Sequence, residues 1–255
     1  MLKNVLRIVD FLINHPTSFV NVNLWARTEL RNNQLTAMAD ATGSDKGSKK
    51  HMFTRIYDAL FADKRKDVAN LLEIGLLCHK DQNLIGGKSF SSVPSLEMWA
   101  KYFPLARIYG FDDKDFTSAR GTWTQIFRGD QCKREDLAQI SKVQEPFDVI
   151  IDDALHASYH QQITFSYLFG LVKPGGYFII EDLHYQPCWA EEQYPVGKTF
   201  DYLRKLNEEG VWTSPVATSE ERLEIESNVE SVDFFDSMSQ GVSGANALAV
   251  IKKKS

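Results

Sequence analysis

The chain has 255 residues, of which 43% are hydrophobic and 25% are charged, and its formal net charge is −5. These values are typical of a globular α/β chain with a sizeable core, and an acidic chain without a basic patch is not expected to bind nucleic acid. Three widely spaced cysteines, Cys78, Cys132 and Cys188, form no CxxC pair, which disfavours a disulfide framework and a thiolate zinc site. No apolar run reaches the length of a membrane span, so we expect a cytoplasmic protein.

The first 40 residues are predicted to form two helices ahead of the first strand. Apolar residues recur at helical spacing before Pro16, which ends the first segment. Residues 23–39 are predicted to form the second helix. We expect residues 1–40 to be a helical extension that acts as a lid or as an oligomer contact, which favours a homo-oligomer, and residues 41–255 to form the main domain.

Strands and helices then alternate along the chain. The apolar patterns predict helices at residues 51–61, 95–102, 133–142, 159–169 and 200–206. They predict strands at residues 68–75, 106–111, 125–128, 147–151, 177–180, 229–235 and 247–252. Alternation of this kind indicates parallel strands with right-handed crossovers, and no helix is expected between the last two strands. The expected fold is an α/β doubly wound sheet, mostly parallel, with one antiparallel C-terminal strand and additional N-terminal helices.

Acidic residues stand at the end of each predicted parallel strand. They are Glu73, Asp112, Asp130, Asp152 with Asp153, and Glu181 with Asp182. The carboxyl ends of parallel strands lie at one edge of an open sheet, and ligands bind at that edge. The sequence therefore predicts that carboxylates from distant parts of the chain converge on one crevice.

The acids of the first three strands are candidates for a nucleotide site. Glu73 and Gly75 end the first strand, Asp112 after the second could accept the hydroxyls of a ribose, and Asp130 could meet an adenine amino group. The alternative is that Asp112 and Asp130 cap helices or lie in solvated loops. The stretch after Gly75 lacks GxGxxG, and the chain lacks GxxxxGK[ST], so a nicotinamide dehydrogenase and a P-loop kinase are both disfavoured.

The later acids are candidates for a metal site. Asp153, Glu181 and Asp182 follow neighbouring strands, and three adjacent carboxylates repel one another unless a cation neutralises them or some are protonated. Oxygen ligands fit a hard ion, above all Mg²⁺. The alternative is that one or two of these acids only cap helices.

A histidine near the same edge is a candidate general base. His156 lies three residues after Asp153 and could take the proton of a metal-bound hydroxyl. His160 and His184 are competitors for this role.

The chain resembles the mycinamicin and tylosin type of macrolide sugar O-methyltransferase over residues 42–185. The most specific stretches are Asp153-Ala154-Leu155-His156, Lys173-Pro174-Gly175-Gly176 and Ile180-Glu181-Asp182-Leu183. Similar pieces in the same order are Ser44-Asp45-Lys46-Gly47, Leu72-Glu73-Ile74-Gly75, Ser95-Leu96-Glu97-Met98-Trp99, Tyr102-Phe103-Pro104, Gly110-Phe111-Asp112 and Phe127-Arg128-Gly129-Asp130-Gln131.

This resemblance implies a class I methyltransferase (Rossmann-like) fold in residues 41–255, with S-adenosylmethionine and Mg²⁺ as cofactors. It implies metal ligation by Asp153, Glu181 and Asp182, with His156 as the base. The residues implied to line the cofactor site are Glu73, Gly75, Ser95, Asp112, Asp130, Gln131 and Asp153. The implied reaction moves a methyl group to a sugar hydroxyl in the biosynthesis of a glycosylated antibiotic, with a glycoside or a nucleotide-linked sugar as the acceptor.

Two other functions stay open at this point. A hydroxylase of the cephalosporin-biosynthesis kind resembles the same family, although the spacing of a two-histidine, one-carboxylate iron site is missing. A non-catalytic binding protein could retain the fold without turnover, which the intact set of acids and His156 disfavours.

Overall fold

The computed structural model describes residues 33–76, 90–236 and 247–255. The predicted helix before Pro16 and residues 23–32 of the second predicted helix lie outside these ranges. Of the helices within them, none combines the length and the apolar character that crossing a bilayer requires.

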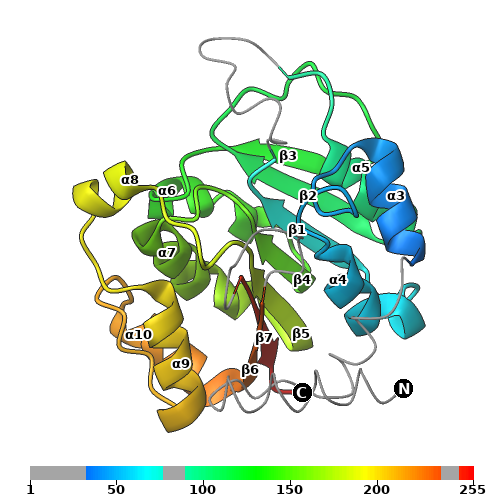
Figure 1. Cartoon of the computed structure of the whole chain (residues 1–255). Helices are drawn as coiled ribbons and strands as arrows, with labels where there is room; N and C mark the ends of the chain where they lie inside the picture. Colours follow the sequence, from blue (N-terminus) through cyan, green and yellow to red (C-terminus); the bar gives the residue numbers. More distant parts are fainter. Residues whose placement is uncertain (1–32, 77–89, 237–246) are drawn as a thin grey trace.

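Seven strands form one sheet at the centre of the structure (Figure 1). They are β1 (Asn70–Ile74), β2 (Arg107–Asp112), β3 (Gln125–Arg128), β4 (Phe147–Asp152), β5 (Val172–Ile180), β6 (Val229–Phe235) and β7 (Leu248–Lys253). The order across the sheet is β3-β2-β1-β4-β5-β7-β6. The first five strands pair in parallel, and β7 runs antiparallel to both β5 and β6. The predicted sheet with one antiparallel C-terminal strand is confirmed.

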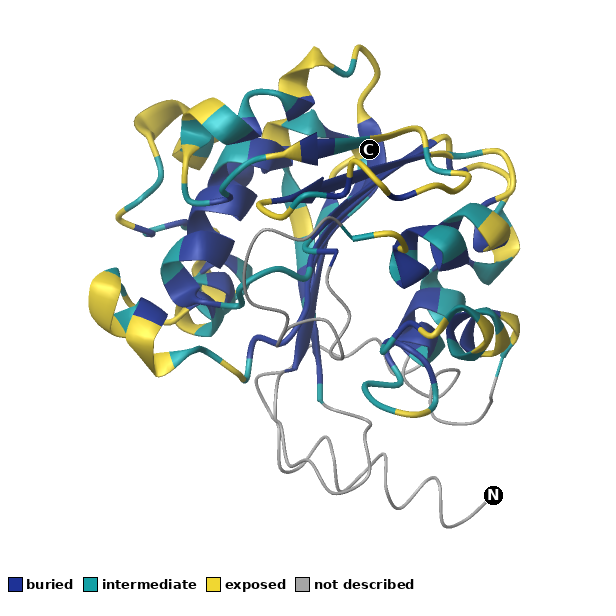
Figure 2. Cartoon of the chain, turned by 90° about the horizontal axis from the view of Figure 1, so that it is seen from above, coloured by how far each residue is buried: buried dark blue, intermediate teal, exposed yellow. Residues whose placement is uncertain are grey.

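Helices cover both faces of the sheet (Figures 1 and 2). One face carries α3 (Gln34–Thr42), α4 (Thr54–Phe61) and α5 (Pro94–Tyr102). The helices on the side of α7 are α6 (Arg134–Leu137), α7 (Ser158–Leu168), α8 (Cys188–Gln193), α9 (Thr199–Glu209) and α10 (Ser219–Asn228). Short 3₁₀ helices span Ala62–Lys64, Ile140–Lys142 and Phe169–Leu171. The fold is therefore doubly wound, as expected.

Two hydrophobic cores lie on the two faces of the sheet, because successive side chains of a strand point in opposite directions. Leu71 of β1 is buried in the core that contains Trp99 of α5, whereas Leu72 is buried in the core that contains Phe165 of α7. Both leucines are fully buried. A strand that is apolar on both faces reads as a continuous hydrophobic run, which is why the parallel strands were recognisable from the sequence.

The helix α3 belongs to the first core. Its Leu35 and Ala39 are fully buried, and α3 packs against α4 and α5. Asn33 caps its first turn by accepting a hydrogen bond from the Thr36 amide at 2.7 Å, and Gly43 ends it in the left-handed conformation. The separation of residues 1–40 from the main domain stays a prediction, since most of that segment lies outside the described residues.

Three local features differ from the sequence-based expectation. The helices α8 and α10 were not predicted. The helix predicted at residues 133–142 is divided into α6 and the 3₁₀ turn Ile140–Lys142. The glycine-containing turn at residues 173–176 is the first half of β5, with a register irregularity against β4 and a left-handed Gly175. Glycine allows this irregular strand to continue where another residue would break it.

Candidate active site

The ends of β1, β4 and β5 bring the acidic residues together. Ile74 at the end of β1 pairs with Asp152, which pairs in turn with Ile180 at the end of β5. The residues immediately beyond these strands, Asp153 and Glu181, therefore lie at the same edge as Glu73. Of the acids predicted to converge, Glu73, Asp153 and Glu181 meet at one lysine.

We call the carboxyl end of the sheet, where Glu73, Asp153 and Glu181 meet, the acidic edge. Lys46 lies at its centre. It belongs to the loop between α3 and α4, and its side chain is 1% exposed. Its Nζ contacts Glu73 Oε1 at 3.2 Å and Glu181 Oε2 at 3.0 Å, and it donates a short hydrogen bond to Asp153 Oδ2. Burial alone would lower the pKa of Lys46, but its carboxylate partners, with Asp153 first, raise that pKa well above its usual value. Lys46 is therefore a charged, buried counter-ion.

Glu181 is held on both oxygens. Lys46 binds Oε2, and the Tyr57 hydroxyl of α4 donates a short hydrogen bond to Oε1. Burial and the neighbouring Asp153 charge raise the pKa of Glu181 well above its usual value, and Lys46 opposes this. The aromatic ring of Tyr57 packs edge-on against Trp99 with centroids 5.0 Å apart, which fixes the hydroxyl in place.

Asp153, His156 and Asp182 form a group that could hold a cation. Their ligand atoms lie within 4.8 Å of one another. His156 Nε2 is 3.8 Å from Asp182 Oδ2, and Asp182 Oδ1 is buried with no hydrogen-bond partner among the described residues. An unpartnered buried carboxylate oxygen is costly, and a divalent ion would satisfy it, so the residues fit the metal. Of the three predicted ligands, the structure places Asp153 and Asp182 in this group and turns Glu181 toward Lys46 and Tyr57.

Two further histidines surround Asp182. His51 Nδ1 lies 3.7 Å and His184 Nδ1 lies 3.9 Å from Asp182 Oδ1. Burial lowers the pKa of His51 to about 4 and also lowers the pKa of His184. Burial and the Asp153 charge raise the pKa of Asp182 to about 7. Burial thus keeps the imidazoles of His51 and His184 neutral, so that their nitrogen atoms are available as metal ligands.

The backbone is strained where the metal group sits. His156 has φ 65° and Asp182 has φ 52°, both in the left-handed region that residues with a side chain seldom adopt. Such conformations cost about 1–3 kcal/mol each and cluster at functional sites. Burial lowers the pKa of His156, so its imidazole is neutral at neutral pH and can accept a proton. The Nδ1 atom of His156 is also buried without a partner among the described residues.

Gly75 and Asp112 shape the edge next to the acids. Gly75 has φ 87°, and a Cβ at this position would overlap the backbone of Asp153 and Ala154. Asp112 accepts hydrogen bonds from the amide of Leu76 at 2.7 Å and from the amide of Lys114 at 2.8 Å, and burial raises its pKa to about 6. Its carboxylate therefore orders the chain that leaves β1, which is the position of the predicted cofactor site.

The remaining predicted cofactor residues have contacts of their own. Burial raises the pKa of Glu73, while Lys46 and the neighbouring Ser95 of α5 oppose that rise. Both carboxylate oxygens of Glu73 are buried with no hydrogen-bond partner among the described residues. Gln131 is buried, donates to Asp152 Oδ1 at 3.3 Å and Thr164 Oγ1 at 3.0 Å, and accepts from the Leu155 amide at 3.1 Å. Gln131 thus fixes the loop before His156, while its contact with a cofactor stays a prediction.

Asp130 lies in a second group of potential ligands with Cys132 and His160. Its carboxylate accepts a hydrogen bond from the Cys132 amide at 3.0 Å. His160 Nδ1 is buried and has no partner among the described residues. His160 is therefore separate from the Asp153–Asp182 group, whereas its former competitor His184 lies beside that group.

Three residues of the site were not singled out from the sequence. Lys46 belonged to a polar loop, Tyr57 to the apolar face of a predicted helix, and His51 to the start of that helix. Lys46 contacts Glu181 across 135 positions of sequence, which no local pattern encodes. The one available signal was the stretch 44–47, which is among those that carry the family resemblance.

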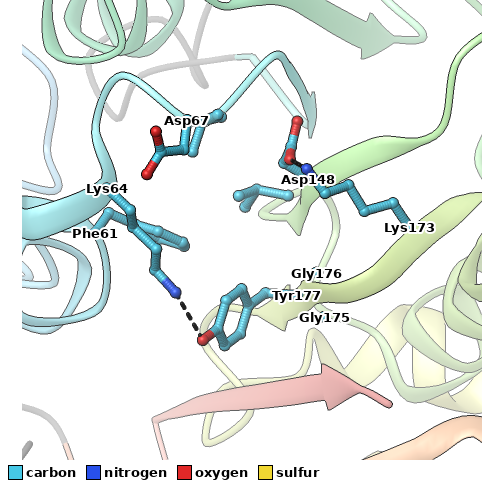
Figure 3. A pocket seen from close by; sticks show the side chains of 10 residues that line it. Phe61, Lys64, Asp67, Asp148, Lys173, Gly175, Gly176 and Tyr177 are labelled. Carbon is cyan, nitrogen blue, oxygen red and sulfur yellow. Dashed lines mark hydrogen bonds and ion pairs between the residues drawn. The ribbon is translucent and has the colours of Figure 1, made fainter. Parts of the chain in front are cut away.

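A pocket of about 200 Å³ lies at the opposite edge of the sheet (Figure 3). Its lining includes Val68, which precedes β1, and Asp148 at the beginning of β4. Several of its polar groups are already paired with one another: Lys64 donates to the Tyr177 hydroxyl at 2.9 Å, and Asp148 accepts hydrogen bonds from Lys173 and from the Asn70 amide. None of the predicted site residues, all of which the structure describes, lines this pocket.

Comparison with known proteins places these features in context. None of the protein-family models compared with the chain matches it. The chain is 35% identical over 161 residues to mycinamicin VI 2''-O-methyltransferase of Micromonospora griseorubida, covering 61% of this chain and 39% of that protein. It is 31% identical over 222 residues to 8-demethyl-8-(2-methoxy-alpha-L-rhamnosyl)-tetracenomycin-C 3'-O-methyltransferase of Streptomyces olivaceus, covering 84% of this chain and 52% of that protein.

Solved structures give the same relationship. The MycE methyltransferase of the mycinamycin biosynthetic pathway, in complex with Mg and SAH, matches with a TM-score of 0.65 and 26% identity, over 88% of this chain and 55% of that chain. A second crystal form matches with a TM-score of 0.67 and 25% identity, over 98% of this chain and 60% of that chain. The chain spans about half the length of these relatives. In sequence and in its class I methyltransferase fold, the chain is thus similar to the sugar O-methyltransferases of antibiotic biosynthesis, and the predicted resemblance is confirmed.

Proposed function

We propose that the chain is an S-adenosylmethionine-dependent, Mg²⁺-assisted O-methyltransferase that acts on a hydroxyl of a sugar in a glycosylated natural product. The observation that carries the proposal is the group of Asp153, His156 and Asp182 at the carboxyl edge of the sheet, directly beside Gly75. The similarity to methyltransferases whose solved structures contain Mg and SAH supports the same cofactors here.

Asp153, Asp182 and Glu181 are the residues that would hold the metal. Carboxylate oxygens are the ligands that Mg²⁺ prefers, and the unpartnered Oδ1 of Asp182 is the atom most in need of a cation. When bound, the metal supplies a positive charge that lowers the pKa of an acceptor hydroxyl. Glu181 would have to exchange its present contacts with Lys46 and Tyr57 to join the ligand set.

His156 would act as the general base. Its imidazole is neutral because burial lowers its pKa, and its Nε2 lies 3.8 Å from Asp182, so it is next to the place where the hydroxyl would bind. The proton of the hydroxyl passes to Nε2, the hydroxyl oxygen gains the methyl group, and the methyl–sulfur bond breaks to leave S-adenosylhomocysteine. The Asp182 carboxylate stabilises the protonated imidazole that results.

The residues after β1 and β2 would position the methyl donor. Asp112 and Gly75 shape this part of the edge, with Glu73, Ser95, Asp130 and Gln131 as further predicted lining residues. Gly75 permits close approach of β1 to Asp153, so donor and base occupy neighbouring positions at the edge. Positioning of this kind supplies much of the rate because a sulfonium methyl group is already reactive.

The exposed ring of Tyr185 would mark the acceptor side. Tyr185 is 58% exposed, and its ring centroid lies 6.3 Å from that of His156. Trp189 of α8 is also exposed, at 60%. Exposed aromatic faces beside a polar site suit the apolar face of a sugar ring. Trp212, in contrast, is fully buried and donates to Ser166 at 3.0 Å, so it belongs to the core.

Cytoplasmic location and assembly are part of the same proposal. The spacing of the three cysteines supports a reducing compartment. The predicted helices within residues 1–40 support a homo-oligomer, which sedimentation of the full chain would test.

Calorimetry and an activity assay would test the function. We expect S-adenosylhomocysteine to bind the full chain, and methyl transfer from S-adenosylmethionine to a deoxysugar glycoside to require Mg²⁺ and to stop with EDTA. The proposal is wrong if the protein binds neither S-adenosylhomocysteine nor Mg²⁺. Binding of both without turnover on any glycoside would instead support the non-catalytic alternative.

A hydroxylase remains the second candidate because three imidazoles, those of His51, His156 and His184, lie within 4 Å of the Asp182 carboxylate. Nitrogen ligands suit Fe²⁺ better than Mg²⁺. Substrate-dependent consumption of oxygen with Fe²⁺ would favour this function, and formation of S-adenosylhomocysteine would exclude it as the main activity.

A further inference from the structure

Lys46 and a divalent ion need the same oxygen atoms. The Lys46 ammonium group contacts Asp153 and Glu181, which are two of the three predicted metal ligands. It also contacts Glu73, which comes from β1 and is not among those ligands. The ammonium group donates hydrogen bonds to Asp153 and Glu181, whereas its contact with Glu73 is an ion pair without hydrogen-bond geometry. Two of these three carboxylates are shared with the metal, and Glu73 is not.

Lys46 is the buried cation of this acidic edge. In residues 33–76, 90–236 and 247–255, no other lysine or arginine forms an ion pair with Glu73, Asp153 or Glu181. The side chains of Lys46, Glu73 and Glu181 are at most 1% exposed, so bulk water and salt screen these contacts weakly. Without the ammonium group, three neighbouring carboxylates would repel one another across a medium of low dielectric.

We propose that Lys46 is a resident counter-ion and positioning residue, which holds Glu73, Asp153 and Glu181 together in the metal-free protein and yields Asp153 and Glu181 to the divalent ion when it binds. The inference rests on the proposed function, because it assumes that these acids ligate the metal. Glu73 remains as the partner of the ammonium group after the exchange. Lys46 therefore competes with Mg²⁺ and weakens its binding, while the metal-free fold depends on it.

Substitution of Lys46 tests the competition without measuring activity. The Kd of the full chain for Mg²⁺, measured by titration calorimetry, should fall about tenfold or more in Lys46→Met, because a repelling charge next to the ion is gone. Lys46→Arg keeps the charge and should stay within about threefold of the wild type. In thermal unfolding, Lys46→Met should be destabilised without metal, and saturating Mg²⁺ should restore most of the loss.

Lys253 provides a matched control. Lys253 is also a buried lysine and lies at the end of β7. Its Nζ pairs with Glu224 of α10 at 2.7 Å, away from the acidic edge. Lys253→Met should lose thermal stability as well, but Mg²⁺ should not restore it, and its Kd for Mg²⁺ should equal that of the wild type.

Each outcome decides the proposal. Unchanged or weaker Mg²⁺ binding by Lys46→Met overturns it, since Lys46 would then support the metal ligands instead of competing for them. A Lys46→Met protein that folds only with Mg²⁺ supports it, whereas one that Mg²⁺ cannot rescue overturns it. If the wild type itself binds no Mg²⁺, the metal part of the proposed function fails; if the wild type binds Mg²⁺ and Lys46→Met matches it, only the exchange fails.

Discussion

Gly75 lies so close to Asp153 that a Cβ on the glycine would overlap the aspartate backbone. The amide of Asp153 also donates a hydrogen bond to the carbonyl of Ile74 at 2.8 Å, so β1 and β4 stay joined beyond the end of the sheet. This close approach links the predicted methyl-donor side of the edge to the predicted metal side.

Gly75→Ala should therefore lower the stability of the fold. The left-handed φ of 87° and the backbone overlap together should lower the free energy of unfolding by about 3 kcal/mol, measured with urea. Gly210→Ala is the control, because Gly210 has φ 72° but open space around its Cβ, and it should cost about 1 kcal/mol. Equal losses in the two variants would show that the contact with Asp153 is unimportant.

His156→Ala should separate catalysis from cofactor binding. Loss of a general base lowers turnover by about 10²–10⁴-fold, whereas calorimetric binding of S-adenosylhomocysteine should stay nearly unchanged. His160→Ala is the comparison, since His160 lies in the other group, with Asp130 and Cys132, and its loss should leave most of the turnover. Full activity of His156→Ala would remove this residue from the mechanism.

Tyr185→Ala should affect the acceptor and not the methyl donor. The exposed ring beside His156 offers a stacking face, so its removal should raise the KM for a glycoside by roughly fivefold, equivalent to about 1 kcal/mol. Steady-state kinetics with each substrate varied in turn would measure this. An equal change in the KM for S-adenosylmethionine would instead indicate a general distortion of the site.

Asp233 should make stability depend on pH. Burial raises the pKa of Asp233 from 3.8 to about 6. Between about pH 4 and about pH 6, the carboxyl group is therefore protonated in the folded state and ionised in the unfolded state. Its stabilising contribution is complete below the unfolded pKa and is lost as pH rises through about 6. Asp233→Asn should therefore gain stability relative to the wild type by about 2 kcal/mol between about pH 4 and about pH 8. Parallel stability curves for the two proteins would contradict this.

The helix α10 shows what local sequence signals could have predicted. Thr218 accepts a hydrogen bond from the Glu221 amide at 3.2 Å, and Glu221 accepts one from the Thr218 amide at 2.9 Å, which is a capping box. Thr218→Ala should cost about 1 kcal/mol of unfolding free energy, whereas the exposed Ser219→Ala should change it by less than about 0.5 kcal/mol. Equal effects would mean that the cap does not stabilise α10.

The capping signature was readable in the sequence, but the apolar periodicity that predicted the other helices is nearly absent from α10. Most residues of α10 are polar, and Ile225 is its one buried hydrophobic residue. A single buried side chain produces no repeating apolar face, so a prediction based on apolar periodicity misses this helix.

The candidate site also has one part that the sequence predicts and another part that it does not. The strand ends predicted that Glu73, Asp153 and Glu181 would meet, because parallel topology alone brings those positions to one edge. The identity of their counter-ion depends on a contact across 107 positions, between Lys46 and Asp153, and on how the loop after α3 folds over the edge. Side-chain direction, such as the turn of Glu181 toward Tyr57, is set by packing and is not encoded in spacing.

The loop and helix that carry Lys46 and Tyr57 come before the first strand of the sheet. A fragment that starts at β1 would retain all seven strands and yet expose Glu73, Asp153 and Glu181 to one another with neither the ammonium nor the phenol present. The fragment would also lose the side chains of α3 and α4 that are buried in the first core, among them Leu35, Ile56 and Phe61, so we expect it not to fold. The smallest autonomous version of this protein therefore begins upstream of Lys46, well before its sheet does.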